Sequence, residues 1–381
     1  MEPTKKHIII VAGEASGDMH AAHLVEELKQ KDPSLRFSGL GGPKMQESGV
    51  FLYKDLTKIA VVGFIEVLKH YKEIKKAFDL ILQKIGETKP AAVILIDYPG
   101  FNLRLAKELK KRNVKVIYYI SPQVWAWKKN RVYQIKDYVD RLLVVFKFEQ
   151  EFYARYGIAV TFVGHPLMDT VFIESTKEDV LKSIGLTDYK LTVGLLPGSR
   201  EKEVEVHLPI MLAAAQELHK EFPMLQFLLI QAPTIEATMF NEHLTALPPL
   251  FPLKIVEGKT YDAIHACDVC MVTSGTATLE TAILQKPMVV IYKTSLFTWA
   301  LAKLLVKIPN IGLVNVVAGK RVVPECIQFQ ATAANIAKEL KNIFTNEIKI
   351  ADIKAELKKV KESLGAPGAS SRAAQEILKI I

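Results

Sequence analysis

Short apolar runs alternate with segments of helical period along most of the chain. The runs are continuously apolar, which is typical of strands buried on both faces of a parallel sheet. After the first run, Ala21, Leu24, Val25 and Leu28 recur at the spacing of one helix face. The repeated strand–helix units predict a doubly wound α/β fold. The predicted strands cover residues 7–12, 91–97, 114–120, 141–146, 159–163, 191–196, 226–231, 252–256, 268–273 and 287–292.

The strand–helix series starts a second time near the middle of the chain. The stretch VGHPLMD at 163–169 closes the first set of strands, and LTVGLLPGSR at 191–200 opens the second. A chain of 381 residues also exceeds the size of one ordinary hydrophobic core. We therefore predict two Rossmann-like domains facing each other across a cleft, with residues 1–168 in the first and 169–365 in the second.

The end of the chain reads as a linker followed by a helix. In GAPGASSRAAQEIL, glycine and proline precede a helical pattern that Ser370 or Ser371 would cap. We expect this C-terminal helix, within residues 366–381, to pack back on the first domain.

Composition and charge narrow the classes of partner. The chain is 49% hydrophobic and 24% charged, as in ordinary globular proteins, and its net charge of +9 suits an anionic partner. No nucleic-acid-binding motif occurs, so an anionic membrane or a phosphorylated lipid-like substrate is favoured over nucleic acid. Cys267 and Cys270 form a C-x-x-C pair without a second pair. Buried, inert thiols in a reducing compartment are therefore expected, not a zinc site.

One segment predicts contact with a membrane surface. The sequence shows no signal peptide and no apolar stretch of about 20 residues, so we expect a soluble protein. In the segment 59–78, apolar residues precede lysines from Lys69 to Lys76, as in helices that lie on anionic membranes. A helix of the protein core would explain the same pattern equally well. The predicted membrane patch comprises Val61, Val62, Phe64, Val67 and Leu68.

The loop LLPGSREKEV is the strongest phosphate-binding candidate. A predicted strand ends at Pro197, and Gly198 and Ser199 then expose backbone amides. Arg200 adds a planar fork of donors suited to a diphosphate. A simple strand-to-helix turn with a surface arginine is the alternative.

A second candidate loop is VTSGTATLETA. Ser274, Gly275 and Thr276 stand where a strand gives way to a helix, so free amides and the helix dipole favour phosphate. Glu280, one turn further on, is placed to accept from ribose hydroxyls. Ordinary N-capping is the alternative for this loop alone, but two such loops at neighbouring strand ends are more specific together.

The first domain offers a carboxylate at a strand end. In ILIDYPGFN, Asp97 leaves a buried strand at the edge where open α/β sheets bind ligands. Apolar surroundings would raise its pKa towards that of a useful base, although a turn-forming aspartate is the alternative. In SPQVWAW we expect one of Trp125 and Trp127 in the core and the other facing a ligand or lipid. His165 is either structural or a ligand contact at the domain junction.

The first loop, GEASGD, resembles a dinucleotide-binding turn but carries acids. A nicotinamide dehydrogenase needs G-x-G-x-x-G after its first strand, and this chain lacks it. Glu14 and Asp18 would repel a pyrophosphate, whereas the glycines let backbone approach a substrate. We therefore expect GEASGD to form a wall of the cleft other than the one that holds phosphate.

Taken in order, these motifs resemble one family. GEASGD, IDYPGFN, SPQVWAW, VGHPL, LLPGSR, SGTATLE and GASSRAAQEIL closely resemble the lipid-A-disaccharide synthases. The resemblance implies a GT-B glycosyltransferase that joins UDP-2,3-diacylglucosamine to 2,3-diacylglucosamine 1-phosphate by a β(1→6) bond and releases UDP. It also implies a peripheral protein on the cytoplasmic face of a Gram-negative inner membrane, and the possibility of a homodimer that exchanges C-terminal segments.

The resemblance gives the candidate residues roles in an inverting transfer. Asp97 would take the proton from the acceptor 6-hydroxyl, and Arg200 with the amides at 274–276 would stabilise the departing UDP. Glu280 would hold the uridine ribose, and Asn315 in IGLVN would belong to the nucleotide-sugar site. No D-x-D motif is present, so no metal or other cofactor is expected. The acceptor-side residues would be Glu14, Ser16, Asp18, Trp127 and His165.

The residues alone are also compatible with two other classes of protein. Another UDP-sugar GT-B enzyme, such as a UDP-N-acetylglucosamine epimerase or a muramyl-lipid glycosyltransferase, would share the SGT…E element but not necessarily GEASGD or the membrane patch. A two-lobed sugar-binding module without turnover would need no carboxylate at position 97.

Overall fold

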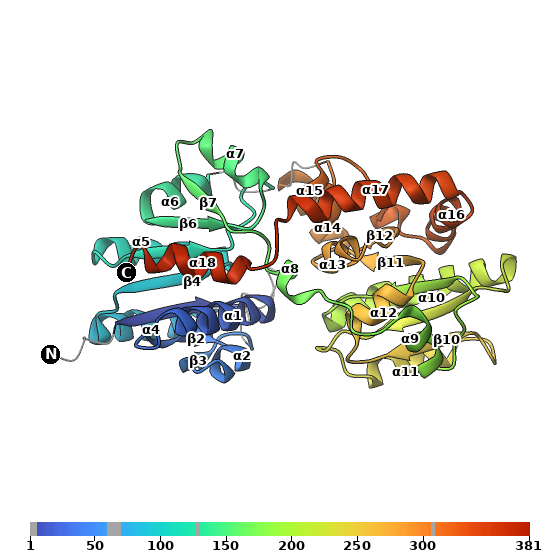
Figure 1. Ribbon diagram of the computed structural model, residues 1–381, viewed down its shortest axis with the longest axis horizontal. Helices are drawn as coiled ribbons and strands as arrows, with labels where there is room; N and C mark the ends of the chain where they lie inside the picture. The colour runs from blue at the N-terminus through green and yellow to red at the C-terminus, as the bar shows by residue number, and fades with distance from the viewer. Residues whose placement is uncertain (1–5, 59–69, 127–129, 306–308) are drawn as a thin grey trace. The chain divides into compact units, whose positions relative to one another are not determined.

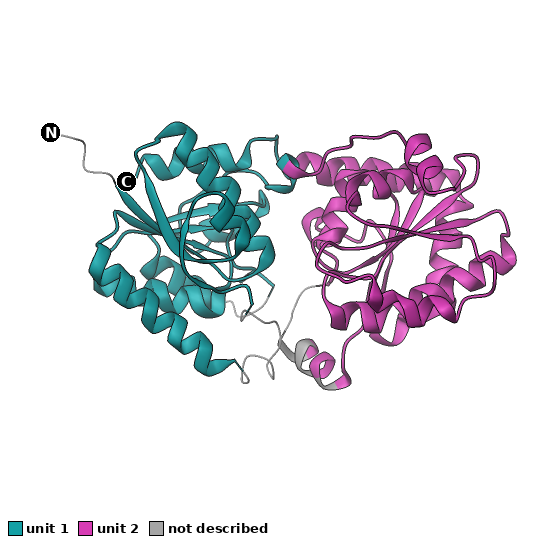
Figure 2. Cartoon of the chain, turned by 90° about the horizontal axis from the view of Figure 1, so that it is seen from below, with its two compact units in different colours: residues 1–169, 364–381 teal, residues 170–363 magenta. Residues whose placement is uncertain are grey.

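The chain folds into two compact units, which Figure 2 shows in different colours. Unit 1 comprises residues 1–169 and 364–381, and unit 2 comprises residues 170–363. These edges lie beside the domain boundaries expected from the sequence, 168/169 and 365/366. The computed structural model describes residues 6–58, 70–126, 130–305 and 309–381.

Unit 1 is built on a seven-stranded sheet with the order β3-β2-β1-β4-β5-β6-β7, in which every pair of neighbours is parallel (Figure 1). The strands are β1 His7–Ala12, β2 Arg36–Gly41, β3 Phe51–Asp55, β4 Ala92–Ile96, β5 Val116–Tyr119, β6 Arg141–Val144 and β7 Val160–Phe162. The helices are α1 Ala15–Lys31, α2 Pro43–Glu47, α4 Tyr71–Thr88, α5 Pro99–Lys111, α6 Arg131–Tyr138, α7 Phe148–Ala154, α8 Leu167–Thr170 and α18 Ala369–Leu378.

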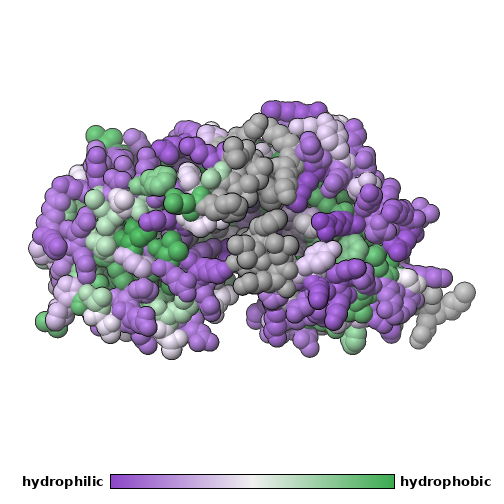
Figure 3. Space-filling view, turned by 180° about the vertical axis from the view of Figure 1, so that it is seen from behind, coloured by the Kyte–Doolittle hydropathy of each residue, from purple (hydrophilic) through white to green (hydrophobic). Residues whose placement is uncertain are grey.

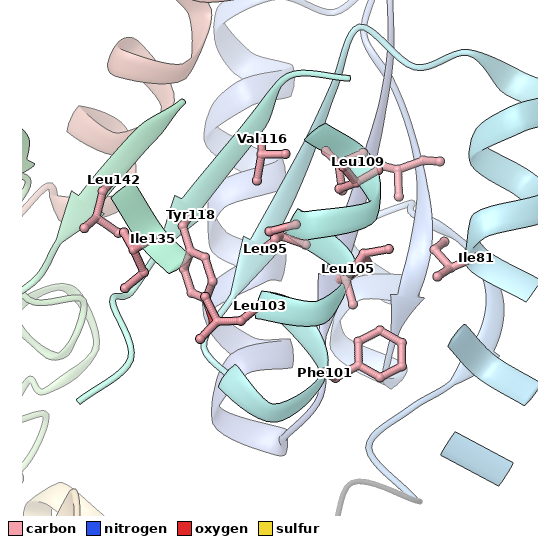
Figure 4. Packing of buried hydrophobic residues seen from close by; sticks show 14 of the residues in the cluster. Ile81, Leu95, Phe101, Leu103, Leu105, Leu109, Val116, Tyr118, Ile135 and Leu142 are labelled. Atoms are coloured by element: carbon pink, nitrogen blue, oxygen red, sulfur yellow. The ribbon is translucent and has the colours of Figure 1, made fainter. Parts of the chain in front are cut away.

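The core of unit 1 is split between the two faces of this sheet. Alternate residues of a strand point to opposite faces. Leu95 of β4 packs with Phe101 and Leu105 of α5, and Ile81 of α4 joins the same cluster (Figure 4). Ile96 lies on the other face, under α1. This two-sided burial explains why the predicted strand is continuously apolar.

Unit 2 repeats the design with a six-stranded parallel sheet in the order β10-β9-β8-β11-β12-β13. The strands are β8 Thr192–Leu196, β9 Gln226–Ile230, β10 Leu253–Val256, β11 Val269–Thr273, β12 Met288–Tyr292 and β13 Glu325–Ile327. The helices are α9 Lys177–Ser183, α10 Glu201–Glu221, α11 Thr238–Thr245, α12 Thr260–Ala266, α13 Ala277–Ile283, α14 Leu296–Leu305, α15 Leu313–Ala318, η1 Gln328–Gln330, α16 Ala333–Phe344 and α17 Glu347–Ser363.

The ten predicted strands are confirmed, and the structure adds β2, β3 and β13. The sequence of β2, RFSGLG, lacks the apolar run that marks the other central strands. Its Gly39 lies so close to β1 that an added Cβ would come 1.8 Å from the carbonyl oxygen of Ile10. Close backbone approach therefore explains part of the missing hydrophobic signal.

The C-terminal helix α18 returns to unit 1 and packs against α1, as the sequence predicted (Figure 1). The expected serine cap is wrong, because α18 begins at Ala369 after Gly368, and neither Ser370 nor Ser371 occupies the cap position. Asp169 instead accepts hydrogen bonds from the backbone N–H groups of Gly368 and Ser370. A residue distant in sequence thus supplies the acceptor that a local cap would provide.

The face of the molecule in Figure 3 is mostly hydrophilic, with hydrophobic residues in separate groups on it. No helix in the described part of the chain is long and apolar enough to cross a membrane. The predicted membrane patch and the acceptor-side Trp127 lie outside the described residues.

Candidate functional site

The carboxylates predicted for the site in unit 1 meet where its strand order reverses. In open α/β sheets, ligands bind outside the carboxyl ends of the strands at that reversal. The reversal lies between β1 and β4, where Ala12 pairs with Ile96. Asp97 follows β4 directly, and Glu14 stands two residues after β1. The topology therefore brings Glu14 and Asp97 to the same edge of the sheet.

The backbone at Asp97 adopts a conformation that side chains rarely accept. Asp97 and Tyr98 both have left-handed torsions, with φ of 44° and 45°. The carbonyl oxygen of Asp97 accepts from the Asn102 side-chain amide at 2.8 Å and from the Tyr118 hydroxyl at 2.5 Å. Such strain persists where surrounding contacts fix it, and it clusters at functional sites.

Gly13 makes room for this turn. A Cβ added at Gly13 would lie 2.4 Å from the Tyr98 ring, so no other residue fits without moving that ring. The ring in turn stacks on Phe101 of α5, with centroids 5.8 Å apart. Gly13, the first residue of GEASGD, and Tyr98, the residue after Asp97, are thus packed against each other.

The environment of Asp97 favours its protonated form. Burial, and secondly the neighbouring Glu14 carboxylate, raise the pKa of Asp97 to about 7. An aspartate in water titrates near 4, so this carboxyl is tuned towards accepting a proton at neutral pH. The prediction of a raised pKa from apolar surroundings is confirmed, and Glu14 adds a cause that the sequence did not reveal.

The other residues of GEASGD differ in what they offer. Asp18 is buried, and its carboxylate accepts from the backbone N–H groups of Gly42, Lys44 and Met45 at 2.7, 2.9 and 3.1 Å. It therefore caps the short helix α2, which leaves it little capacity for sugar hydroxyls. Ser16, in contrast, is exposed in the first turn of α1.

His165 is built into the protein interior. It is buried beside Phe146, with ring centroids 5.1 Å apart, and its Nδ1 accepts from the Leu167 N–H at 3.1 Å. Burial lowers its pKa to about 3, so the imidazole is neutral at physiological pH. These contacts give His165 a structural role at the turn into α8.

Unit 2 has its own reversal of strand order, between β8 and β11, where Leu196 pairs with Val272. The two predicted phosphate loops follow these strands directly, at 197–200 and 274–276. The structure therefore places both loops at the edge of the sheet where a ligand is expected.

The loop after β8 presents hydrogen-bond donors. The N–H of Ser199 donates to Glu203 at 3.1 Å, and Arg200 donates from Nη1 to the same carboxylate at 2.8 Å. The Thr234 hydroxyl donates to the Ser199 carbonyl oxygen at 2.6 Å, which ties the loop to the segment after β9. Arg200 immediately precedes helix α10.

The loop after β11 combines donors with a carboxyl group. The N–H of Ser274 donates to the Ile291 carbonyl at 2.9 Å, and its hydroxyl donates to the Ile311 carbonyl at 3.1 Å. Gly275 and Thr276 then lead into α13. Glu280 accepts from the Tyr261 hydroxyl at 3.2 Å, and burial raises the pKa of Glu280.

Comparison with known proteins identifies the family. The model of the family described as lipid-A-disaccharide synthetase matches residues 8–381. The chain belongs to the lipid-A-disaccharide synthetase family. A lipid-A-disaccharide synthase of Syntrophus aciditrophicus is 44% identical over 376 residues, covering 99% of this chain and 98% of the relative. One of Geobacter sulfurreducens is 44% identical over 380 residues, covering 100% and 98%. The chain is thus a glycosyltransferase of lipid A biosynthesis.

Solved structures support the GT-B fold expected for this family. The glycosyltransferase of kitacinnamycin matches with a TM-score of 0.67 at 15% identity, over 100% of both chains. The Staphylococcus aureus MnaA–UDP structure matches with a TM-score of 0.67 at 13% identity, covering 99% of this chain and 98% of that one. At these identities the likeness concerns the fold alone.

The hydrogen bonds of Asn315 give it a structural role in unit 2. Its amide nitrogen donates to the Val323 carbonyl and to Glu325, both at 2.9 Å. Its amide oxygen accepts from the N–H groups of Val322 and Val323 at 2.7 and 3.0 Å. All four hydrogen-bonding positions of this buried amide are used. Asn315 therefore anchors the start of α15 and has no position left for a nucleotide.

Sequence reasoning missed two acids near the site loops. Glu149 is buried at the start of α7. It accepts from the Trp125 indole N–H at 3.3 Å and from the Phe146 N–H at 3.1 Å. Burial raises the pKa of Glu149 to about 8. Glu203 holds the loop after β8. Glu149 closely follows an apolar strand, as Asp97 does, and that signal could have found it.

The cysteines are all buried. Cys267, Cys270 and Cys326 are free, and burial raises the pKa of the Cys267 thiol well above its usual range. The prediction of buried thiols is confirmed. Within the described ranges, no group of three or more His, Cys, Asp and Glu side chains could hold a metal ion.

Proposed function

We propose that the two units divide the reaction between them, each acting at the sheet edge where its strand order reverses. Unit 1 would receive 2,3-diacylglucosamine 1-phosphate, and unit 2 would bind UDP-2,3-diacylglucosamine. The observation that carries the proposal is the contrast in chemistry: Glu14 and Asp97 at one of these edges, and Arg200 with backbone amides at the other. A base is needed where the acceptor hydroxyl lies, and cationic donors are needed where the diphosphate leaves.

In the proposed transfer, Asp97 removes the proton from the acceptor 6-hydroxyl. The hydroxyl oxygen forms a bond to the donor anomeric carbon while the bond from that carbon to the diphosphate oxygen breaks. The electron pair of the broken bond leaves with UDP, and attack from the opposite side inverts the anomeric carbon. A pKa of about 7 supports this role, because a general base works best when its pKa is near the operating pH.

The leaving group would be held by the two loops of unit 2. Arg200 and the amides at Gly198 and Ser199 would bind one end of the diphosphate, and Gly275 with Thr276 the other. Ser274 would support this loop instead of binding phosphate, because its N–H and hydroxyl are hydrogen-bonded within the unit. Glu280 would accept from the ribose hydroxyls.

On the acceptor side, Glu14 and Ser16 remain the candidates for sugar contact. Glu14 neighbours Asp97 closely enough to raise its pKa, and Ser16 is exposed on the same turn. We leave Asp18 and His165 out of the acceptor contacts, because their hydrogen bonds lie within unit 1.

The protein would act as a peripheral enzyme on the cytoplasmic face of the inner membrane. Both substrates carry acyl chains, and the net charge of +9 suits an anionic surface. Lys72, Lys75 and Lys76 are exposed on α4, directly after the predicted membrane patch. We also propose that a homodimer forms by exchange of the C-terminal segment, which solution mass would test.

Two substitutions test the division between the units. In Asp97→Asn the carboxylate is lost, so kcat should fall by roughly 10²–10⁴ while UDP affinity stays unchanged. In Arg200→Ala a charge-assisted contact is lost, so UDP affinity should fall about tenfold or more. UDP release from acylated UDP-glucosamine and acceptor measures turnover, and calorimetry measures UDP binding.

Exposed residues of the same types provide the controls. Asp79→Asn in unit 1 and Arg321→Ala in unit 2 should behave as wild type. Turnover of Asp97→Asn within about tenfold of wild type would remove Asp97 as the base. Unchanged UDP affinity in Arg200→Ala would remove the loop after β8 as the diphosphate site.

A further inference from the structure

A carboxylate occupies the donors of the proposed diphosphate loop. One oxygen of Glu203 accepts from the Ser199 N–H at 3.1 Å, and the other accepts from Arg200 Nη1 at 2.8 Å. These are two of the donors that the proposed function assigns to the UDP diphosphate. A negatively charged side chain of the protein therefore stands at the place proposed for the negatively charged ligand.

The loop is shaped around this carboxylate. Gly198 has a φ of 130°, and an added Cβ there would lie 2.6 Å from Cβ and 2.7 Å from a carboxylate oxygen of Glu203. Only glycine lets the loop pass this close to the Glu203 side chain. The Glu203 side chain is itself only 20% exposed. The close packing against Gly198 thus fixes the position of the Glu203 side chain.

Helix capping alone does not account for both contacts. Glu203 is the third residue of α10, a position from which a glutamate often reaches back to a backbone N–H before the helix. One oxygen does this at Ser199, but the other binds the guanidinium of Arg200. A cap needs one acceptor, and the second contact, an ion pair between residues three apart, joins the same carboxylate to the arginine of the proposed phosphate loop.

Carboxylate and phosphate oxygens bind a guanidinium and an amide N–H in the same way. A diphosphate that takes these donors must displace Glu203, because two anions cannot share them without repulsion. We propose that Glu203 is an internal competitor for the donor diphosphate. It keeps Arg200 in place while the loop is empty, yields to the nucleotide sugar, and returns as UDP departs. This inference rests on the proposed function of the same loop.

The competitor role and a simple positioning role predict opposite results. If Glu203 competes, Glu203→Gln should bind UDP about tenfold more tightly and release it more slowly, because one like charge is removed from the site. The gain should shrink as salt is raised, since the effect is electrostatic. If Glu203 only positions Arg200 or caps α10, the same substitution should weaken UDP binding or leave it unchanged. Either of those results overturns the inference.

The matched control is Glu205→Gln, which removes the same charge from an exposed position on the same helix. Its UDP affinity should stay within about twofold of wild type, because a solvent-exposed charge is strongly screened. Calorimetry gives the affinities, and stopped-flow displacement gives the rate of UDP release. Thermal unfolding shows whether Glu203→Gln is folded, and Glu203→Asp, whose shorter side chain retains the charge, provides a second variant with an expected intermediate gain in affinity.

Arg200→Ala separates failure of the inference from failure of the proposed function. If Arg200→Ala loses UDP affinity and Glu203→Gln gains none, the diphosphate site stands and the competitor is rejected. If Arg200→Ala leaves UDP affinity unchanged, the site itself is rejected.

Discussion

The two units share one architecture but carry opposite chemistry at the same structural position. In each, a parallel sheet reverses its strand order, between β1 and β4 in unit 1 and between β8 and β11 in unit 2. The first reversal is followed by carboxylates, Glu14 and Asp97, and the second by Arg200 and backbone amides. In the proposed function, the fold determines where each ligand would lie, and the few residues after each strand determine whether that place would suit a hydroxyl or a diphosphate.

The units also differ in how their site loops are supported. In unit 1 the turn at Asp97 is fixed by packing of Tyr98 against Gly13 and by hydrogen bonds to the Asp97 carbonyl. In unit 2 the segment that contacts Ser274 is fixed by a buried polar network around Asn315 and Glu325. This difference predicts that a change in side-chain size disturbs the loop at Asp97 in unit 1. In unit 2, the loss of a hydrogen-bond partner should disturb the loop at Ser274.

Among the substitutions that test this difference in support, the largest effect is expected for Asn315→Ala in unit 2. The substitution leaves the N–H groups of Val322 and Val323 without their acceptor and removes one donor from the buried Glu325 carboxylate, which keeps the N–H groups of Ile311 and Gly312. We expect it to lower the free energy of unfolding by about 3 kcal/mol, since each unsatisfied buried group costs about 1–3 kcal/mol. Denaturant unfolding measures this loss.

Asn335→Ala is the control for that change. Asn335 is exposed on α16, so its removal should change stability by less than about 0.5 kcal/mol. If Asn315→Ala is as stable as Asn335→Ala, the network does not support the loop, and a direct role for Asn315 in nucleotide binding returns.

The corresponding test of unit 1 is Gly13→Ala. The added Cβ would lie 2.4 Å from the Tyr98 ring and force the strained turn at Asp97 to move. Displacing a catalytic group by about 1 Å can cost roughly 100-fold in rate, so we expect kcat to fall by about 10- to 100-fold. UDP affinity should not change, because the perturbation lies in unit 1.

Gly100→Ala is the matched control, because an added Cβ there meets nothing within 4 Å. It lies close in sequence to the same turn but should leave turnover near that of wild type. A Gly13→Ala enzyme with normal kcat would mean that the Tyr98 packing does not position Asp97.

The apolar runs predicted the fold well because most strands are buried on both faces. Ten strands were located in this way, whereas β2, with Gly39 and Gly41, carries too little apolar surface to be recognised. The short edge strand β13 was missed as well. Helix α18 was predicted to return to unit 1, but its cap was not, because Asp169 lies far away in sequence.

The sequence predicted the positions of the candidate loops at strand ends better than the contacts of single residues. Loops at strand ends are visible in the sequence, so Asp97 and Arg200 could be placed at their sheet edges. The partners of a side chain are not visible. Asp18 and Asn315 have the residue types of ligand contacts, yet their hydrogen bonds lie within the protein. Glu203 was overlooked although it lies only four residues after Ser199, and a glutamate at the third position of a predicted helix was a signal that could have found this contact.

The smallest effect is expected for Glu14→Gln, which sharpens the role of the acidic pair. Glu14 is the second cause, after burial, of the raised pKa of Asp97. Removing its charge should lower that pKa, so the ionised base would persist to lower pH. We expect the acid limb of the kcat/KM profile to move to lower pH by less than about one unit, because burial still acts. Glu26→Gln, an exposed change on helix α1, which follows Glu14, should leave the limb in place.

This profile also separates two roles of Glu14. If Glu14 only tunes Asp97, the acceptor KM at high pH should equal that of wild type, where Asp97 is ionised in both enzymes. If Glu14 also binds a sugar hydroxyl, the acceptor KM should rise at every pH. An acid limb that stays in place or moves to higher pH would show that the two carboxylates do not interact, and the contrast between the units would then rest on Asp97 and Arg200 alone.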